Sequence, residues 1–380
     1  MKNIAATFRA RFAQEPIIVR SPGRVNIIGE HTDYNEGFVL PAAIDKFIYV
    51  AVSKRDDAQI ELYAANFKES LSIAVANIKP SGKWDAYVLG VVDQLLNRGY
   101  VIGGFNMVLD GEVPIGAGLS SSAAVECAVV FALNELFVLG LDKMEMVRIA
   151  QQAEHAYSGV LCGIMDMFAS MFGKQDQVIK LDCRSLDYEY RPLLLQGYKL
   201  VLFNTNIKHA LASSAYNTRR QECEQGVAWV KQVLPEVNSL RDVSVAMLDT
   251  HVAPKNALVY QRCRFVVDEI KRLEAACNDL ANGNLTALGQ KLFETHQGLS
   301  QYYEVSCREL DFLVDAVKGN PAVLGARMMG GGFGGCTLNI VKEDAIDQLS
   351  ETLAKSYQEA TQLELSTIIV NTANGTALIH

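Results

Sequence analysis

Residues 113–124 read VPIGAGLSSSAA, in which two glycines and three consecutive serines precede an apolar segment. Glycine lets the backbone adopt positive φ angles and come close to a ligand. The apolar periodicity of residues 120–138 predicts a helix that begins at these serines. Because the first turn of a helix has unpaired N–H groups and the positive end of the helix dipole, the segment predicts a binding site for a polyanion such as a triphosphate.

This loop differs from the nucleotide-binding loop of P-loop proteins. No lysine follows its glycines, and the pattern GxxxxGK[ST] occurs nowhere in the chain. The loop alone fits two interpretations equally well, a phosphate-binding loop and a glycine turn followed by a serine cap. Other segments are needed to choose between them.

A second glycine cluster, GGGFGG at residues 330–335, formally matches the dinucleotide-binding pattern GxGxxG. That pattern requires a strand before it and a helix after it. Residues 336–341, CTLNIV, are instead typical of a strand. A strand–turn–strand hairpin that comes close to a ligand is therefore the better prediction.

A run of polar side chains lies in residues 21–35, SPGRVNIIGEHTDYN, after a short apolar strand. Polar groups on a loop braced by a strand often present hydrogen-bond partners to a small polar ligand. The carboxylates and the imidazole of Glu30, His31 and Asp33 suit sugar hydroxyl groups, which both donate and accept. The alternatives are a solvated turn and a metal site formed by these three side chains. The metal site is disfavoured because no further ligand motif, such as HExxH, is present.

The elements around these motifs mix strands and helices. Their order favours an α+β fold with segregated layers over a regular series of βαβ units. A proline and a glycine at residues 192 and 197 precede a new strand, which places a domain boundary near residue 195 and predicts domains 1–195 and 196–380. The predicted strands cover residues 17–20, 47–53, 105–109, 199–204 and 336–341, and the predicted helices cover residues 120–138, 144–157, 165–172, 214–233 and 258–282.

The composition excludes several classes of protein. The 380 residues carry a formal net charge of −8, which argues against a nucleic-acid-binding protein because phosphate backbones require a basic surface. The N-terminal residues do not resemble a signal peptide, and no apolar run has the length of a membrane-spanning helix. The eight cysteines form no CxxC pair, so we expect reduced thiols in a cytoplasmic protein.

Together, the motifs resemble those of the GHMP kinase superfamily, named for galacto-, homoserine, mevalonate and phosphomevalonate kinases. PGRVNIIGEHTDYN comes first, PIGAGLSSSAA second and MMGGGFGGC last, in the order found in that superfamily. GEHTDYN is the most specific of these motifs and is similar to the signature of the galactokinase family. Further similarities occur at GIMD (residues 163–166), Lys208-His209 and YNTRR (residues 216–220), so the resemblance covers nearly the whole chain.

The resemblance implies a two-domain fold, with an N-terminal α/β domain, a C-terminal ferredoxin-like domain and the active site in the cleft between them. It implies transfer of the ATP γ-phosphoryl group to O1 of galactose, which yields galactose 1-phosphate and ADP and is the first committed step of galactose catabolism. The implied cofactor is Mg²⁺ and ATP is the co-substrate, and neither nucleic acid nor a membrane is an expected partner. We expect a monomer.

The resemblance also implies a role for individual residues. Asp166 is the implied catalytic carboxylate, and Arg24 lies beside it. Contacts with the sugar are expected from Glu30, His31, Thr32, Asp33, Gly163, Asp166 and Tyr216. The ATP phosphates are expected at Gly116, Ala117, Gly118, Leu119, Ser120, Ser121 and Ser122, and Mg²⁺ at Ser122 and Glu154.

Two segments depart from the family pattern. Met167 occupies a position where glutamine is common, and Gln301 and Tyr302 lie where acidic residues are common. Sugar specificity therefore stays open, with N-acetylgalactosamine, arabinose and galacturonate as alternative substrates. A non-catalytic sensor of sugar and ATP is a further alternative, which the presence of Ser122 and Asp166 disfavours. Whether Asp166 abstracts the proton of O1 or mainly orients it also stays open.

Overall fold

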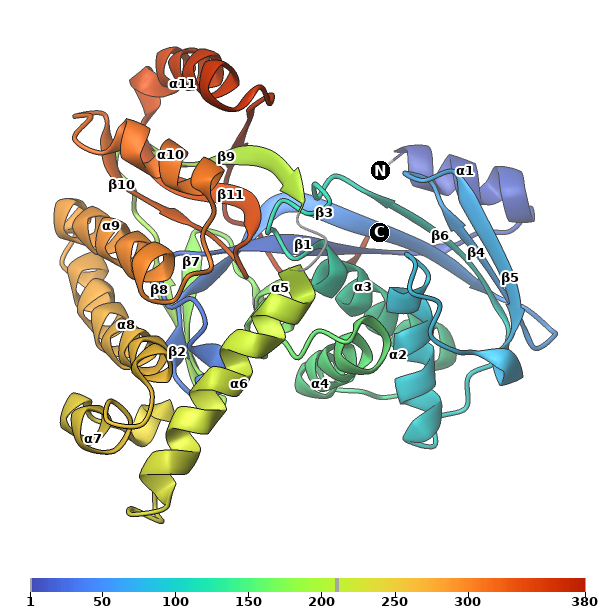
Figure 1. Ribbon diagram of the computed structural model, residues 1–380. Coiled ribbons are helices and arrows are strands. Elements are labelled where there is room, and N and C mark those ends of the chain that lie inside the picture. Colours follow the sequence, from blue (N-terminus) through green and yellow to red (C-terminus); the bar gives the residue numbers. More distant parts are fainter. Residues whose placement is uncertain (1, 209–211, 380) are drawn as a thin grey trace.

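Six strands of the described chain form a twisted sheet in the N-terminal half of the protein (Figure 1). The computed structural model describes residues 2–208 and 212–379. The strand order is β13-β1-β3-β6-β4-β5, and neighbouring strands are antiparallel except β4 and β6. The bounds are β1 Ile17–Asn26, β3 Pro41–Lys54, β4 Gln59–Ala64, β5 Glu69–Ala74, β6 Phe105–Gly111 and β13 Ala377–Ile379.

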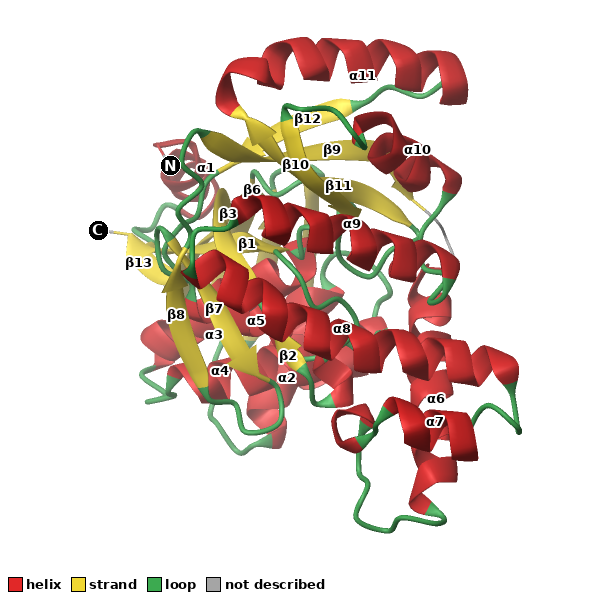
Figure 2. Cartoon of the chain, turned by 90° about the vertical axis from the view of Figure 1, so that its left-hand side faces the viewer, coloured by secondary structure: helices red, strands yellow, loops and turns green. Residues whose placement is uncertain are grey.

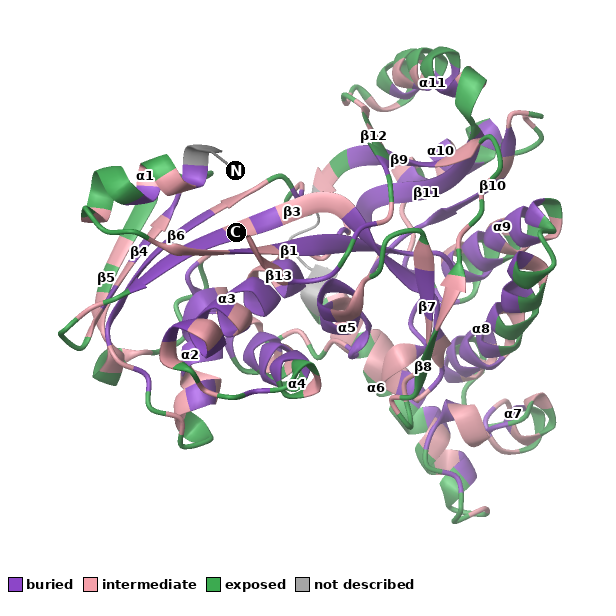
Figure 3. Cartoon of the chain, turned by 180° about the vertical axis from the view of Figure 1, so that it is seen from behind, coloured by how far each residue is buried: buried purple, intermediate pink, exposed green. Residues whose placement is uncertain are grey.

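Helices cover both faces of this sheet. α3 (Ser121–Phe137) packs on β1 and β3, with α2 (Ala86–Asn97), α4 (Lys143–Ala153) and α5 (Met165–Phe172) around it. Most of α3 is buried because small or apolar side chains occupy nearly all of its faces (Figure 3). On the opposite face, α1 (Lys2–Phe12) covers β3 and β6. The glycine-rich loop therefore connects a buried strand, β6, to a buried helix, which fixes its position.

The C-terminal half contains a second, antiparallel sheet in the order β12-β9-β11-β10. This is the strand order of a ferredoxin-like βαββαβ unit. Residues of β9 alternate between its two faces, so that Val201 and Phe203 contact α10 and α11 while Leu200 and Leu202 join the main core. The bounds are β9 Tyr198–Lys208, β10 Val323–Met328, β11 Gly334–Lys342, β12 Ser366–Val370, α10 Arg308–Val317 and α11 Ile346–Thr361.

A long helical segment separates β9 from β10. It contains α6 (Ala212–Lys231), α7 (Val245–His251), α8 (Ala257–Ala281) and α9 (Leu285–Gln301) before α10. α8 and α9 run side by side below the second sheet, and α6 packs on α8 (Figure 2). These helices have an apolar cluster of their own, which includes Val266 and Leu299. The helical segment thereby supplies a wall beside the first sheet.

A small third sheet and the end of the chain connect the two halves. The small sheet has the order β2-β7-β8, with β2 Phe38–Val39, β7 Gln177–Asp182 and β8 Tyr188–Pro192. After β12 the chain returns to the first sheet, where Asn371 hydrogen-bonds to Asp45 and β13 pairs with β1. A domain boundary near residue 195 would assign residues 377–379 to the C-terminal domain. In the structure, however, these residues form a strand of the first sheet, which belongs to the N-terminal half.

The structure agrees with most of the predicted elements and differs at one of them. β10 and β11 form the hairpin that we expected around residues 330–335. Arg24, however, lies within β1 and not on a loop, because β1 continues through the first part of the polar run to Asn26. His209, from the Lys208-His209 similarity, lies outside the described residues. No helix in the described ranges has both the length and the apolar character needed to cross a membrane.

Candidate active site

A cavity lies where the two halves of the protein meet. It is lined by residues from β1 and the loop after it, the start of α3, the segment before α5, the first turn of α5, α6 and the hairpin between β10 and β11. Most of the polar side chains predicted for the site are among them. The lining residues are Arg24, Glu30, His31, Asp33, Ser122, Glu154, Val160, Cys162, Met165, Asp166, Tyr216, Gly330 and Gly331.

Arg24 and Asp166 form a bidentate ion pair in this cavity. Nε of Arg24 donates to Oδ1 of Asp166 at 2.8 Å, and Nη2 donates to Oδ2 at 2.9 Å. The Ser120 hydroxyl donates to Oδ2 at 2.5 Å, and Nη1 of Arg24 donates to the carbonyl of Gly118 at 2.6 Å. The Arg24 side chain is 4% exposed and that of Asp166 is 24% exposed. Asp166 therefore faces the cavity, with Arg24 buried behind it.

The glycine-rich loop packs closely against the second glycine cluster. Gly118 has a φ angle of 75°, which favours glycine, and a Cβ atom there would stand 3.1 Å from the carbonyl oxygen of Met329. Conversely, a Cβ atom at Gly330 would stand 3.1 Å from the carbonyl oxygen of Gly118. The side chains of Ala117 and Leu119 are buried in the core, so only their backbone groups could meet a phosphate.

Two buried carboxyl groups lie beside the first turn of α3. Glu154 begins a π-helical turn, Glu154–Ser158, directly after α4, and lines the cavity together with Ser122. Burial raises the pKa of Glu154 to about 7, although the neighbouring Ser122 and Glu126 lower it in part. Burial also raises the pKa of Glu126 well above its usual range, with Glu154 next to it. Oxygen donors without a cationic side chain bound to them are the kind of group that a hard cation prefers.

Asp33 lies against Gly163 and lines the cavity. A Cβ atom at residue 163 would stand 1.9 Å from Oδ2 of Asp33, so the carboxylate needs glycine at this position. Burial, reinforced by the charge of Asp166, raises the pKa of Asp33 to about 7. Gly163 thus contributes to the predicted sugar site by leaving room for Asp33.

Glu30 and Thr32 form an ion pair and hydrogen bonds with other residues of the protein. Glu30 forms an ion pair with Arg327 at 2.9 Å and accepts a hydrogen bond from the backbone N–H of Gly330 at 2.9 Å. Although burial alone would raise it, Arg327 holds the pKa of Glu30 below its ordinary value. The hydroxyl of Thr32 donates to the carbonyl groups of Gly29 and Phe38 and does not line the cavity. Thr32 therefore shapes the loop, and Glu30 connects the loop to the hairpin.

Tyr216 and His31 form an aromatic wall of the cavity. Their ring centroids are 5.3 Å apart, and a Cβ atom at Gly331 would stand 3.2 Å from the Tyr216 ring. Burial lowers the pKa of His31 to about 4, so its ring is neutral near pH 7. The alternative interpretation of Glu30, His31 and Asp33 as a metal site, already disfavoured by the sequence, finds no support, since no group of three His, Cys, Asp or Glu side chains in the described ranges could hold a metal ion.

A second cavity adjoins the first one at Ser122. Its wall is mainly apolar and aromatic, and it shares Ser122 with the first cavity. No local motif predicted it, because its lining comes from short separate segments between residues 48 and 125. The lining residues are Ile48, Ala64, Asn66, Phe67, Gly82, Lys83, Trp84, Tyr87, Leu109, Asp110, Gly111, Val113, Ile115, Ser121, Ser122 and Val125.

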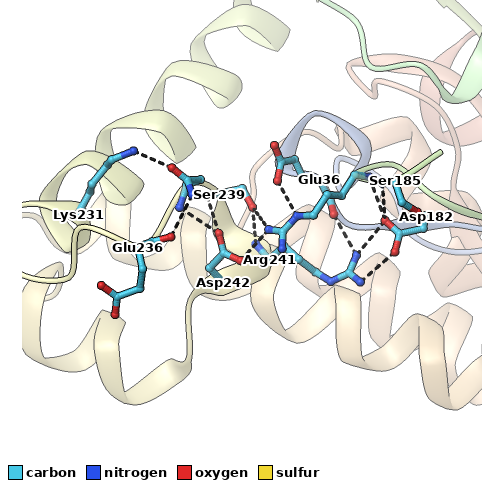
Figure 4. A network of polar contacts seen from close by, with 10 residues as sticks. Glu36, Asp182, Ser185, Lys231, Glu236, Ser239, Arg241 and Asp242 are labelled. Carbon is cyan, nitrogen blue, oxygen red and sulfur yellow. Dashed lines mark hydrogen bonds and ion pairs between the residues drawn. The ribbon is translucent and has the colours of Figure 1, made fainter. Parts of the chain in front are cut away.

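A polar network holds the far end of the loop that carries His31 and Asp33 (Figure 4). Arg184 donates to Glu36 at 2.7 Å and to Asp242 at 2.7 Å. Arg241 donates to the backbone carbonyl of Glu36 at 3.0 Å and to Asp182 at 3.1 Å. Partly exposed ion pairs add little stability individually, but this network fixes Glu36 to both the small sheet and the helical segment.

The comparisons with known proteins point to one family. The galactokinase galactose-binding signature matches residues 6–54, the GHMP kinase N-terminal domain residues 86–174 and the GHMP kinase C-terminal domain residues 273–359. The chain is 41% identical over 357 residues to a galactokinase of Thermotoga neapolitana, covering 94% of this chain and 98% of that protein. It is 39% identical over 361 residues to a galactokinase of Bacillus subtilis, covering 93% of this chain and 92% of that one.

A solved structure shows the same fold. The crystal structure of Lactococcus lactis galactokinase in complex with galactose superimposes with a TM-score of 0.94 at 35% identity, over 98% of each chain. The predicted two-domain α+β fold is thereby confirmed. With the motifs, the cavity and the relatives all in agreement, the chain belongs to the galactokinase family of the GHMP kinases, which are ATP-dependent enzymes.

Proposed function

We propose that D-galactose binds in the cavity that contains Asp33, His31 and Tyr216, and that the γ-phosphoryl group of ATP is transferred to its O1. The products would be α-D-galactose 1-phosphate and ADP, at the first committed step of galactose catabolism. The position of Asp166 supports this most directly, because its carboxylate shares one cavity with Asp33 and with Ser122 at the start of α3. A hydroxyl group beside Asp166 would lie next to phosphates bound at that helix terminus.

At the reacting centre, Asp166 would receive the O1–H group and Arg24 would stabilise the charge of the transferred phosphoryl group. Arg24 and Ser120 already hold both oxygens of Asp166 in place. Phosphoryl transfer depends mainly on positioning and on charge stabilisation, and its loose transition state needs little early proton transfer. These bonds therefore favour Asp166 as a group that orients O1–H and accepts the proton late.

Nucleotide binding would use both sides of α3's first turn. The backbone of residues 116–122 would bind the phosphates, and the apolar cavity with Trp84 and Phe67 would accept the adenine base. Aromatic and aliphatic walls with few polar groups are typical of sites for flat ligands. Because the two cavities share Ser122, one ATP molecule could extend from the base site to the sugar.

Ser122 and Glu154 would hold the Mg²⁺ ion that accompanies ATP. Both residues line the cavity, and Glu126 adds a second buried carboxyl group next to Glu154. A divalent cation bound there would offset the charge of the β- and γ-phosphates. Ser122 would thereby act both in the phosphate site and in the metal site.

Three further expectations accompany this function. We propose that the enzyme acts as a monomer, that its N-terminal and C-terminal domains divide near residue 195, and that it works in the cytoplasm. The free state of all eight cysteines, which lie within the described ranges, is consistent with a reducing compartment. Sedimentation measurements over a range of protein concentrations would test the monomer.

The function is tested by measuring ADP release with a panel of sugars. We expect galactose to give the highest kcat/KM, with glucose much lower although it differs only at C4. A site built to hydrogen-bond one hydroxyl group can strongly reject a sugar in which that group is misplaced. N-acetylgalactosamine, arabinose and galacturonate complete the panel. Comparable kcat/KM values for glucose, or a higher value for one of these three, would contradict the proposed substrate.

A further inference from the structure

We propose that Glu269 on α8 is a positioning residue for sugar binding, because its buried carboxylate holds the backbone of Gly29. Gly29 begins the sugar loop (residues 29–37), which carries His31 and Asp33 to the cavity. The inference therefore rests on the proposed galactose site. Glu269 itself does not line the cavity, so its effect on a bound sugar would act through the backbone of the sugar loop.

The carboxylate of Glu269 accepts hydrogen bonds from two parts of the protein. Its Oε1 accepts from the backbone N–H of Gly29 at 3.0 Å. The hydroxyl of Thr295 on α9 donates to Oε1 at 3.1 Å and to Oε2 at 2.9 Å, and Arg272 forms an ion pair with Oε2. The Glu269 side chain is completely buried. A backbone N–H and an arginine can only donate, so the ionised carboxylate fits both of them.

Gly29 also packs directly on α8. Its φ angle is 94°, and a Cβ atom there would stand 2.4 Å from Cδ1 of Leu273 and 2.8 Å from the carbonyl oxygen of Phe38. A buried backbone N–H requires an acceptor, and Glu269 supplies one from 240 positions farther along the chain. This hydrogen bond connects the beginning of the sugar loop to the helical segment.

The backbone of the sugar loop is strained at two positions. His31 has a φ angle of 62° and Glu36 one of 57°, a region that residues other than glycine seldom adopt. Such conformations persist where the surrounding structure fixes them. Arg241 holds the far end of the loop at the carbonyl group of Glu36, and Glu269 holds its beginning at Gly29. The loop side chains that line the cavity lie between these two contacts.

Loss of the contact at Gly29 should change sugar affinity more than the chemical step. Without it, the binding-competent loop is less populated in the free protein, and the apparent Kd for the sugar rises in proportion. Asp166 and Arg24 are held by one another and by the glycine-rich loop. A loss of binding that is equal for the ground state and the transition state raises KM and leaves kcat nearly unchanged.

The test removes the acceptor with the substitution Glu269→Met, which keeps the length of the side chain. We expect the galactose Kd and KM to rise about tenfold, because the N–H of Gly29 loses a hydrogen bond to a charged group. The kcat value and the ADP Kd should stay within about threefold of the parent. Arg272 is 18% exposed and lies 3.6 Å from Glu294, so its charge keeps a partner in the variant.

Asp279→Leu is the matched control. Asp279 also lies on α8 and forms an ion pair with Lys291 on α9, and its side chain is 19% exposed. This pair joins the same two helices as Glu269 does, but its side chains have no hydrogen bond to the sugar loop within the described ranges. The control should bind galactose like the parent protein. If it binds as weakly as Glu269→Met, loosening α8 from α9 is sufficient and the inference is wrong.

Glu269→Gln is the conservative variant. Its amide oxygen can still accept from Gly29, but without a charge, so the galactose Kd should lie between those of the parent and Glu269→Met. If Glu269→Met does not fold, Glu269→Gln decides the question, and we then expect a galactose Kd two- to fourfold above that of the parent, as for a weaker neutral hydrogen bond. A Kd equal to that of the parent would overturn the inference.

Isotope labelling observes the contact itself. Isoleucine directly precedes glycine at residues 28–29, 102–103 and 115–116, so carbonyl-labelled isoleucine with ¹⁵N-glycine selects three backbone amide signals. The substitution Ile28→Val removes one of them and thereby assigns Gly29. That signal should shift in Glu269→Met while the other two stay in place. An unchanged Gly29 signal, or a shifted one with an unchanged galactose Kd, would contradict the inference. If the parent binds no galactose, the proposed function fails instead.

Discussion

Gly163 lies so close to Asp33 that a Cβ atom at residue 163 would stand 1.9 Å from Oδ2 of that carboxylate. Gly163→Ala should therefore displace Asp33 from its position in the cavity. We expect the galactose KM to rise at least tenfold, with the free energy of unfolding reduced by about 1–3 kcal/mol, as for an overpacked site. Steady-state kinetics and denaturant unfolding would measure the two effects.

Gly103→Ala is a suitable control for that variant. A Cβ atom at residue 103 would meet nothing closer than 3.5 Å, an ordinary contact with the Phe137 ring. It lies outside the cavity, so the galactose KM should not change. If Gly163→Ala binds galactose as well as this control does, Asp33 is not part of the sugar site or can move without loss.

The raised pKa of Asp33 predicts a dependence of stability on pH. In the unfolded chain Asp33 ionises near its ordinary pKa of 3.8, but in the ligand-free protein it keeps its proton up to a pKa of about 7. The folded state therefore binds more protons at Asp33 between these values, and the stabilisation that Asp33 contributes falls as pH rises from about 4 to about 7 and is constant above that. The contribution of Asp33 is thus favourable in acid and lost at neutral pH.

Asp33→Asn removes this charge. At pH 8 the variant should unfold a few degrees above the parent protein, because it avoids burying a carboxylate beside Asp166. At pH 5 the difference should be smaller, since Asp33 is then protonated in the folded parent. Thermal unfolding without sugar measures both, and groups other than Asp33 cancel in the comparison. An equal difference at the two pH values would contradict the assignment of the pKa.

Nucleotide binding can be followed by tryptophan fluorescence, because the chain has two tryptophans. Trp84 lines the proposed base cavity, while Trp229 lies on α6 beside Lys255. ADP should change the fluorescence of Trp229→Phe, which keeps Trp84, and should leave that of Trp84→Phe unchanged. A signal that comes from Trp229 alone would place the base elsewhere.

The sequence predicted the parts of the site that are encoded in short segments. The glycine-rich loop, the start of α3 and the group of His31 and Asp33 each depend on neighbouring residues, so their motifs reveal them. Arg24 was placed on a loop because its strand was expected to end earlier. A proline and a glycine at residues 22 and 23 are unfavourable in a strand, but the antiparallel pairing with β3 carries β1 through them with a bulge.

Other parts of the site depend on contacts between distant residues and have no local pattern. Arg327 pairs with Glu30 across about 300 positions, and nothing near either residue indicates the other. Tyr303 reaches Tyr34 only because α6, α8 and α9 pack into one helical wall. The base cavity collects single side chains such as Phe67 and Trp84 from separate segments. Such contacts follow from tertiary packing and could not be predicted from one sequence.

Asp166→Asn separates catalysis from sugar binding. The substitution keeps the size of the side chain but removes its charge and its capacity to accept a proton. If Asp166 acts in the transition state, kcat should fall by about 10²–10⁴-fold, while the galactose Kd should change little. Thermal unfolding of the variant is the control for structure, because Arg24 loses its ionised partner. A kcat within a few-fold of the parent would remove Asp166 from catalysis.

The role of Asp166 as a base or as an orienting group requires a further measurement on the parent enzyme. Three donors, two from Arg24 and one from Ser120, already direct the carboxylate oxygens. An oxygen held in this way is well placed to align O1–H, so we expect a solvent isotope effect near unity on the chemical step. A large isotope effect would instead show proton transfer in the transition state. The experiment must follow a single turnover, because slow product release would otherwise hide the chemical step.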